Sequence, residues 1–505
     1  MADFDVWRSR PLDVHRWSQH PQINSIVDTV FDSLNEDQKK AIQGRSNNAG
    51  RASGRDHLKV LLIDLFVAWK TDPGLCIGVA RGNGAYSVNS RYNALHISSR
   101  MPKIIDILCD EGFLDFANGS YNRQGSKQGN RTSRIKAASK LVNLFKQSPA
   151  DVFDIDLHHK QECIILTKDD TNESEKSIRK LEEYTDTPET QEMRDRLQHY
   201  NQFLAETFID IPSFTDPWLV RKKTDGKTQH IPIGPTNKFV RRIFSRGSWD
   251  LNGRFYGGWW QQVDRHLRKE IVINNQPTVE VDYSGIHVAI LSALRDKPAN
   301  VGDRYRLKKH ILQEFTEDEQ RAIVKHLVLT AINARNEKTT YQAFRDDQPT
   351  GSRQKRLKDP ELALFLEAFI EENQHLQDDL CSDQGIRLMN IDSQITDRII
   401  TSFTEHERAI LSVHDSYIVE TFDVDHLSRT MATASKEVVG QDLSFEQSSP
   451  SYGDVMRMGK TDRDRYFDTI KDTLSISHKT EEYEDRLARF IHYRKKNYQH
   501  TYWLG

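Results

Sequence analysis

The sequence predicts a mainly helical α+β fold organised around two short β-rich stretches from distant parts of the chain. In the first, residues 279–282 alternate valine with acidic residues, so a strand would bury the valines and expose the carboxylates of Glu280 and Asp282. In the second, apolar runs within residues 410–420 flank His414-Asp415-Ser416, which indicates a hairpin with an aspartate at its tip. Apolar segments over much of the remaining chain recur at helical spacing.

Length and composition limit the class of protein. A chain of 505 residues predicts roughly two to four domains with ample material for a core. The net charge of −3 gives no global basic field, so any nucleic-acid surface must be a local patch. No apolar run approaches a membrane span, the first residues lack a secretory pattern, and the four cysteines are far apart. We therefore expect a cytoplasmic protein with reduced cysteines and no membrane partner.

The first 167 residues predict a helical, winged-helix-like DNA-binding domain. A helix is expected near residues 26–42, followed by apolar helices at 58–69 and 102–109. Strand-like runs at 115–121 and 131–137 then enclose a polar turn. The order of helix, strand, basic turn and returning strand loosely resembles the DNA-binding domains of plasmid replication initiators. The alternative is a solvated hairpin on a helical domain.

Cations in the turn and returning strand are the candidate DNA contacts of this domain, because they can neutralise phosphates. They are Arg123, Lys127, Arg131 and Arg134.

Beyond this domain, four further segments are predicted. Residues 168–190 are charged and almost free of apolar side chains, which is typical of a solvated linker. Residues 191–250 are expected to be thumb-like or connecting helices, 251–459 a catalytic unit, and 460–505 C-terminal helices.

Asp282 and Asp415 suit a two-metal site. Aspartates at strand ends can bridge two Mg²⁺ ions about 4 Å apart, which activate a hydroxyl and stabilise a leaving pyrophosphate. The expected cofactor is therefore Mg²⁺, two ions, with Mn²⁺ as a substitute.

At these residues the chain resembles a polymerase superfamily. Asp282-Tyr283-Ser284-x-Ile286 looks like the first catalytic motif of family A DNA polymerases, and Val413-His414-Asp415 looks like their last. The His-Asp-Ser form is closer to phage-type single-subunit RNA polymerases. The resemblance covers about residues 246–422 and implies a right-hand polymerase with palm and fingers, DNA as template, and nucleoside triphosphates as substrates. It also implies that His414 orients the primer end and that Tyr283 lies at the nucleotide.

A predicted helix at residues 317–334 lies between the two aspartates in the chain. Arg321, Lys325 and Asn333 fall near one another along one helical face. The family's fingers helix carries a similar Arg-x-x-x-Lys pair, which implies that Arg321 and Lys325 bind the nucleotide and that Lys325 protonates pyrophosphate. An amphipathic helix with a charged stripe is the alternative.

Two segments resemble duplex-binding motifs of the superfamily. Arg246, Gly253 and Arg254 lie among aromatic residues, a combination suited to gripping a nucleic-acid backbone. Asn390 and Gln394 are spaced like amides that contact the minor groove, whose acceptors occur at every base pair. A folded loop with core aromatics is the alternative for the first segment.

Two departures from the family pattern affect the nucleotide site. Asn333 stands where the family has a fingers tyrosine, so base stacking must come from elsewhere, with Tyr341 or Phe344 as candidates. His287 stands where DNA polymerases have a glutamate that excludes a 2′-hydroxyl, and a neutral imidazole could instead hydrogen-bond that hydroxyl.

Together these features predict a template-directed polymerase for replication of a mobile element, recruited by its N-terminal domain to an origin or element end. No carboxylate constellation for a proofreading exonuclease is evident in the first half. One alternative is a single-subunit RNA polymerase or primase, supported by Ser416, His287 and Gly253-Arg254-x-Tyr256. Another is a DNA-binding replication initiator with an inactive palm, supported by Asn333.

Overall fold

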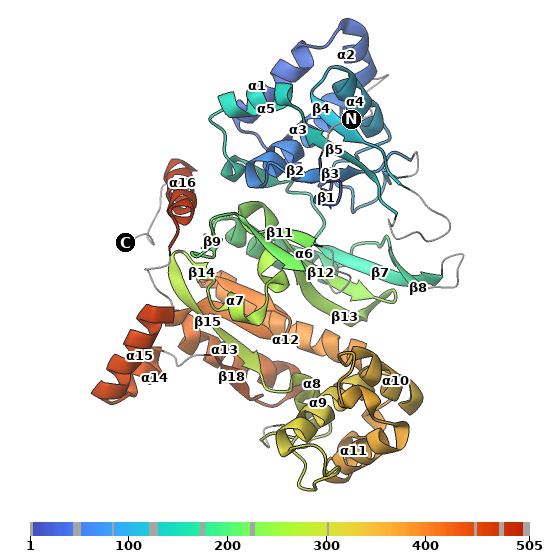
Figure 1. Cartoon of the computed structure of the whole chain (residues 1–505), viewed down its shortest axis with the longest axis vertical. Helices are drawn as coiled ribbons and strands as arrows, with labels where there is room; N and C mark the ends of the chain where they lie inside the picture. The colour runs from blue at the N-terminus through green and yellow to red at the C-terminus, as the bar shows by residue number, and fades with distance from the viewer. Residues whose placement is uncertain are drawn as a thin grey trace.

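The computed structural model describes residues 4–43, 52–82, 85–120, 130–171, 177–222, 228–299, 302–448, 452–473 and 479–497. An N-terminal unit lies at one end of the long axis, sheets occupy the middle, and a lobe of helices lies at the other end (Figure 1). Within the described ranges, no helix combines the length and the apolar character that a membrane crossing requires.

The N-terminal unit is built around α3 (Gly54–Thr71). A reciprocal pair of hydrogen bonds between Ser53 and Asp56 caps its start, and residues 57–68 are buried on every side. A helix that is buried all round serves as the centre of a core rather than as its cover. The surrounding elements are α1 (Pro21–Asp32), α2 (Glu36–Gln43), α4 (Arg100–Asp110), α5 (Ser139–Gln147), β1 (Ser9–Pro11), β3 (Cys76–Val79), β4 (Leu114–Ala117) and β5 (Ser133–Ala137).

The sheet of this unit has the strand order β1-β3-β5-β4, with β1 parallel to β3 and the other pairs antiparallel. The expected succession of helix, strand and returning strand is present as α4, β4 and β5. The turn between these strands, with Arg123 and Lys127, lies outside the described residues. The single helix expected near 26–42 is instead two, because Asn35 and Gln38 exchange capping hydrogen bonds that start α2.

The charged stretch 168–190 was expected to be a linker, but half of its described residues, 168–171 and 177–181, lie in strands. β7 (Ile164–Thr171) and β8 (Ser177–Leu181) form an antiparallel hairpin, and β7 pairs in parallel with β12 (Val240–Ser245). With β13 (Ser248–Gly257), the strand order is β13-β12-β7-β8. The hairpin extends away from the body of the molecule (Figure 1) and exposes charged side chains such as Asp169 and Arg179. A projecting edge hairpin needs few apolar residues, so its composition imitates a linker.

Among its described residues, the segment 191–250 contains most of one α-helix, a short 3-10 helix (Pro235–Asn237) and several strands, so the expectation of thumb-like or connecting helices is wrong for most of it. After α6 (Pro188–Ala205) come β9 (Ile209–Asp210), β10 (Trp218–Lys222) and β11 (Thr228–Pro232). The basic run that follows belongs to β12, where Val240, Arg242 and Phe244 alternate inward.

An ion-pair junction joins α6 to the N-terminal unit. Arg194 donates to Glu162 at 3.1 Å and to Asp186 at 2.6 Å. Arg91 donates to the same two carboxylates at 3.0 and 2.9 Å. Two cations and two acids therefore balance one another.

The central sheet, which we call the site sheet, has the order β16-β17-β15-β14-β9, with β18 also pairing with β15. Its strands are β14 (Val272–Ile273), β15 (Gln276–Tyr283), β16 (Ile410–Val413), β17 (Ser416–Glu420) and β18 (Phe445–Gln447). The hairpin predicted within 410–420 is confirmed as β16 and β17. Its turn consists of His414 and Asp415, and His414 adopts a left-handed φ of 59°.

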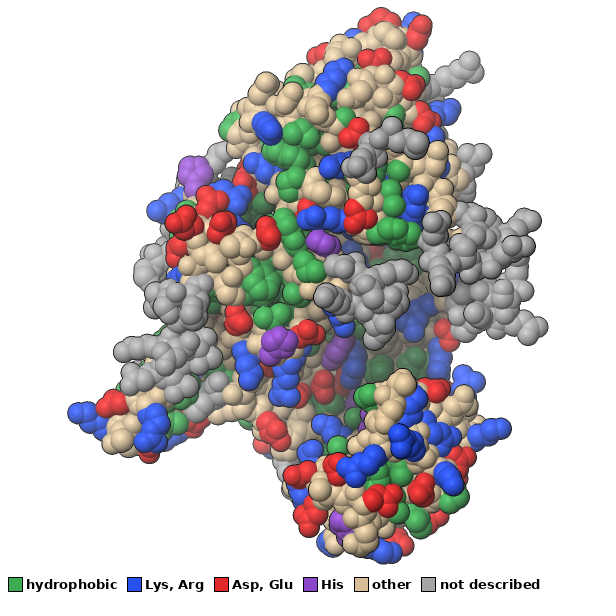
Figure 2. Space-filling model, in the orientation of Figure 1, with side chains coloured by type: hydrophobic (Ala, Val, Ile, Leu, Met, Phe, Trp, Pro, Cys, Tyr) green, Lys and Arg blue, Asp and Glu red, His purple; other side chains and the backbone are tan. Residues whose placement is uncertain are grey.

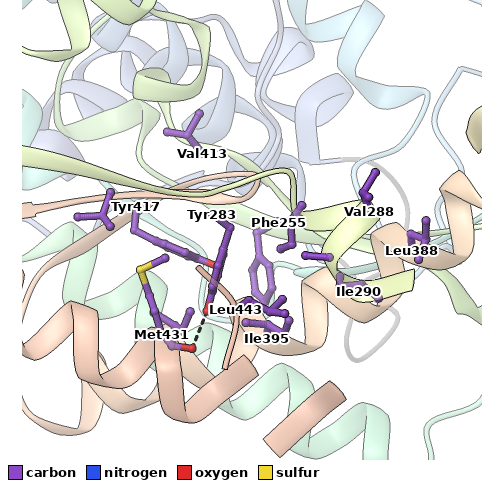
Figure 3. Packing of buried hydrophobic residues seen from close by; sticks show 14 of the residues in the cluster. Phe255, Tyr283, Val288, Ile290, Leu388, Ile395, Val413, Tyr417, Met431 and Leu443 are labelled. Atoms are coloured by element: carbon purple, nitrogen blue, oxygen red, sulfur yellow. Dashed lines mark hydrogen bonds between the residues drawn. The ribbon is translucent and has the colours of Figure 1, made fainter. Parts of the chain in front are cut away.

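One face of the site sheet is packed on helices α12 (Gly385–Glu405) and α13 (Val424–Val439), and α8 (Ile286–Leu294) packs on both helices. Figure 3 shows Tyr283 and Tyr417 from the sheet pointing into this core beside Met431 and Ile395. Since side chains alternate along a strand, Asp282, next to Tyr283, and Ser416, next to Tyr417, face the opposite side of the sheet.

The lobe of helices lies in the chain between α8 and α12. It contains α9 (Glu317–Asn333), α10 (Glu337–Asp347) and α11 (Asp359–Glu372). The helix predicted at 317–334 is confirmed as α9, which Thr316 and Glu319 start with a capping box.

The C-terminal part is helical as expected, with α14 (Tyr452–Arg457), α15 (Lys460–Thr473) and α16 (Glu481–Asn497). Helix α16 touches two distant parts of the molecule. Arg489 pairs with Asp151 of the N-terminal unit at 2.7 Å, and Arg486 pairs with Asp210 of β9 at 2.7 Å. Between them, Phe490 packs on Phe153 and Phe208.

Candidate active site

The strand register brings the two predicted aspartates together. Asp282 on β15 pairs with Ser416 on β17, and Asp415 immediately precedes Ser416 in the turn. The backbone N–H of Tyr283 donates to the carbonyl of Asp415 at 3.3 Å. Two residues 133 positions apart in sequence (415 − 282) are thus neighbours at one edge of the site sheet.

A third carboxylate lies on the same face of β15 but is paired with a cation. Glu280 accepts hydrogen bonds from Arg268 at 2.8 Å and from the Ser416 hydroxyl at 2.8 Å. Asp282 has no such partner among the described residues. Burial, followed by the charges of Asp415 and Glu280, raises the pKa of Asp282 to about 7, while Arg265 and Lys325 pull it down. The edge therefore concentrates negative charge.

The two carboxylates are donors of the kind that a hard divalent cation such as Mg²⁺ takes. Carboxylate oxygens are its preferred ligands, and it commonly takes only one or two from protein, with water and substrate phosphates completing the shell. A divalent cation would also relieve the repulsion between Asp282 and Asp415. In the part of the chain that the structure describes, no group of three or more His, Cys, Asp or Glu side chains is arranged to hold a metal.

Helix α9 faces these carboxylates with cations. Lys325 is exposed and lies close enough to Asp282 to lower its pKa. Arg321, one turn earlier, forms an ion pair with Asp303. Figure 2 shows a hollow between the helical lobe and the rest of the molecule, with Lys and Arg side chains gathered along it. Carboxylates on one wall and cations on the other can hold a cation–polyphosphate complex between them.

Asn333 and the two aromatic candidates for base stacking have no contact with this edge among those of the described residues. Asn333 bonds the carbonyl of Leu329 at 2.7 Å and lies against Gly385, where a Cβ atom would be 1.8 Å from its Oδ1. Tyr341 and Phe344 are buried within α10.

Tyr283 lies in the core and not at the expected nucleotide site. Its hydroxyl donates to the Met431 carbonyl at 2.7 Å, and its side chain is 2% exposed in the core (Figure 3). It lies on the opposite face of β15 from Asp282, so the expected nucleotide contact is wrong for this side chain.

His414 lies beside Asp415 in the turn. Its ring contacts Tyr256 edge-on, with centroids 5.8 Å apart. Burial, followed by the charge of Arg254, lowers its pKa, so the imidazole is neutral at pH 7.

Behind the edge, Arg254, His287 and Asp392 form a buried cluster. Arg254 Nε donates to both carboxylate oxygens of Asp392 at 3.0 Å, and Arg254 Nη2 lies 3.1 Å from His287 Nε2. His287 Nε2 is 3.2 Å from Asp392. Arg254 and His287, expected at the duplex and the ribose, thus direct Nε and Nη2 of the arginine and Nε2 of the histidine to this cluster.

Two other predicted duplex contacts shape the packing of α12 on β13. Gly253 has φ +87°, and a Cβ there would lie 2.9 Å from the Ser393 hydroxyl, so only glycine permits this approach. Asn390 donates to the Trp249 carbonyl at 2.9 Å and is buried. Gln394, in contrast, is exposed on α12.

The remaining predicted cations in the described residues form ion pairs or hydrogen bonds within the chain. Arg246 pairs with Asp383 at 2.7 Å. Arg134 donates to Val6 and Ser9 of the N-terminal unit, which fixes it beside β1. Arg131 donates to the Asn118 carbonyl at 2.5 Å.

Sequence reasoning missed four residues around the edge: Arg265, Asp303, Tyr305 and Asp392. The sequence pattern could have indicated Asp392, because this acid falls on the buried side of a helix that is lined with isoleucines. The other three lie in short or irregular segments without a pattern.

Comparisons with known proteins add little. No family model matches the chain, and no curated protein matches it. Among solved structures it is similar to the POL domain of Pol1 from M. smegmatis, in complex with DNA primer-template and dNTP, with a TM-score of 0.28 and 12% identity. The match covers 51% of this chain and 50% of that one, so the chain spans about half of that structure's length. The likeness is distant, and the chemistry of the site rests on its own residues.

Proposed function

We propose that this chain is a template-directed nucleic-acid polymerase that transfers nucleotides to a primer end on a DNA template. The observation that carries this proposal is the meeting of Asp282 and Asp415 at one edge, opposite the exposed cation Lys325. Paired carboxylates facing cations are the arrangement that phosphoryl-type transfer requires.

Asp282 and Asp415 would hold the Mg²⁺ ions, with Mn²⁺ as a substitute. When bound, these ions supply positive charge that favours ionisation of a 3′-hydroxyl and neutralises the leaving pyrophosphate. Glu280 stays with Arg268, which leaves two carboxylates rather than three for this task.

The cations of α9 would bind the triphosphate. Lys325 is free to contact its phosphates and to give a proton to the leaving pyrophosphate. Arg321 must exchange the carboxylate of Asp303 for a phosphate, which has the same charge sign and similar hydrogen-bonding geometry.

Around the reacting ends, His414 would orient the primer terminus, and exposed Gln394 would contact the duplex. Gly253, Arg254 and Asn390 act through the shape and rigidity of the β13–α12 surface. The N-terminal unit would recruit the enzyme to DNA at an origin or element end, through cations such as Arg131.

RNA synthesis is the second candidate. His287 Nε2 is occupied by Asp392 and Arg254, so exclusion of a ribose by this atom has no support from the geometry. Use of ribonucleotides is therefore tested beside use of deoxynucleotides.

The test is extension of a labelled primer on a DNA template with Mg²⁺, with dNTPs and NTPs in separate reactions and with primer-free reactions alongside. Asp415→Asn should reduce synthesis at least about 1000-fold, because half of the metal-binding carboxylates are lost. Asp264→Asn, an exposed acid on a nearby helix start, is the matched control and should keep wild-type activity.

Each result has a separate meaning. Product from dNTPs alone supports a DNA polymerase, and product from NTPs without primer supports an RNA polymerase or primase. Full activity of Asp415→Asn would refute the assigned site. No product in any reaction, with DNA still bound, would support an initiator with an inactive site.

A further inference from the structure

A buried tyrosine hydroxyl without a partner lies close to the candidate active site. Tyr305 belongs to the segment between α8 and α9, and its ring stacks on Phe369 of α11 with centroids 6.5 Å apart. The residue is 6% exposed, and within the described part of the chain its hydroxyl makes no hydrogen bond. A buried hydroxyl without a partner is costly, which indicates that a ligand supplies one.

The hydroxyl points to the start of α8. A Cβ atom on Gly285 would lie 3.2 Å from the Tyr305 oxygen, and Gly285 is the N-cap of this nine-residue helix in a left-handed conformation. No side chain caps the helix, so its first N–H groups have no side-chain acceptor. The partial positive charge of a helix N-terminus and the tyrosine O–H are both suited to an anion.

The charges around Tyr305 connect it with the candidate active site. Its pKa is raised to about 12, first by burial and then by Asp303, with Asp415 contributing in the same direction and Arg321 and Arg304 opposing. At neutral pH the hydroxyl is therefore a proton donor. It lies within electrostatic reach of one carboxylate of the edge and one cation of α9.

We propose that the Tyr305 hydroxyl and the first turn of α8 form a subsite for the polyphosphate end of a nucleoside triphosphate. This inference rests on the proposed function and adds a phosphate contact within electrostatic reach of Arg321. Because Gly285 has no side chain, none from this position crowds the hydroxyl. The hydroxyl is a positioning group that donates a hydrogen bond and takes no part in bond making.

The test measures binding rather than turnover. The enzyme is loaded with a primer–template whose primer lacks a 3′-hydroxyl, and the matching nucleoside triphosphate is titrated in Mg²⁺ by calorimetry. Inorganic tripolyphosphate and the matching monophosphate are titrated separately. Tyr305→Phe keeps the ring on Phe369 and removes only the hydroxyl, and Tyr341→Phe is the control from a second buried tyrosine of the lobe.

We expect Tyr305→Phe to weaken binding of the triphosphate and of tripolyphosphate about tenfold, the usual effect of one hydrogen bond to a charged group. Monophosphate binding should not change, and Tyr341→Phe should behave as wild type.

Three other outcomes overturn the inference. Unchanged binding by Tyr305→Phe, with Lys325→Ala weakened, refutes the subsite but leaves the proposed function intact. Equal weakening for the monophosphate places the hydroxyl at the sugar or base, or shows a loss of structure. If the wild type binds no triphosphate, the subsite and the proposed function both fail.

Discussion

Two clusters of charge in this molecule are built in opposite ways. At the junction of α6 with the N-terminal unit, Arg91 and Arg194 share the carboxylates of Glu162 and Asp186, so the charges cancel. At the edge of the site sheet, Asp282 and Asp415 are neighbours, and within the described ranges neither forms an ion pair. Balanced charges hold parts of a protein together, whereas unbalanced charges of one sign indicate a place for a ligand.

The comparison also explains the cations that were expected to bind nucleic acid. Arg254 with Asp392 and Arg246 with Asp383 are paired like the junction. Lys325 is exposed and faces carboxylates across an open space, like the edge. The type of residue is the same in both settings, and the partner decides its role.

The largest change in stability should come from removing one charge of the ion-pair junction. Glu162→Gln leaves Arg194, a buried cation, with one carboxylate instead of two and should lower the free energy of unfolding by about 3 kcal/mol. Urea unfolding measures it. Glu192→Gln removes the exposed partner of Arg196 and should cost less than about 0.5 kcal/mol. Equal losses for both variants would contradict the distinction between the junction and an ordinary surface pair.

A smaller effect, of the opposite sign, is expected at the edge. The pKa of Asp282 is about 7 in the folded chain against an ordinary 3.8, so between these values the folded chain holds a proton that the unfolded chain has released. Stability should therefore fall as the pH rises from about 4 to 7. Asp282→Asn should not show this loss. Without metal at pH 8, its free energy of unfolding should exceed that of the wild type by about 1–2 kcal/mol, a figure reduced because Asp282 is partly exposed.

The same variants at pH 4.5 should be nearly equal in stability, since wild-type Asp282 is then protonated. Millimolar Mg²⁺ should stabilise only the wild type and close the gap at pH 8. If Asp282→Asn is less stable than the wild type at pH 8, Asp282 is stabilised by a nearby positive charge, and the edge is not a site of unbalanced negative charge.

The smallest effect tests whether Lys325 of α9 lies near Asp282 at the edge. Lys325→Ala removes a cation that lowers the pKa of Asp282 in the folded chain, so the loss of stability should begin at the same pH as in the wild type and continue to a higher pH. Lys338→Ala, an exposed lysine of α10, should not move it. The measurement is a series of urea unfolding curves between pH 5 and 9 at low salt, conditions chosen because salt screens exposed charges. An unmoved profile would place Lys325 away from Asp282.

Local patterns predicted the elements that carry the edge. Alternation identified the strand of Asp282, and the capping pair Thr316 and Glu319 marks the start of α9. The same alternation groups Tyr283 with Val281 in the core, and family resemblance alone placed it at the nucleotide. Within a strand, period two is the more reliable guide to which face a side chain occupies.

Long-range partners could not be predicted. Asp392 lies 138 residues from Arg254, and nothing local in either segment requires the other. The hairpin β7–β8 was hidden because exposed edge strands and linkers have similar polar compositions. Tyr305 follows no periodic pattern, and its burial depends on Phe369, a residue of another helix.

The contact of α16 with the N-terminal unit has a consequence for how the molecule is made. Asp151 and Arg489 are 338 residues apart, and a ribosome adding about 5–20 residues per second needs roughly 20–70 s to synthesise the interval. Throughout that time the nascent N-terminal unit presents Phe153 without Phe490 to cover it. Co-translational folding must therefore proceed with this seam open, and the seam closes only when α16 emerges.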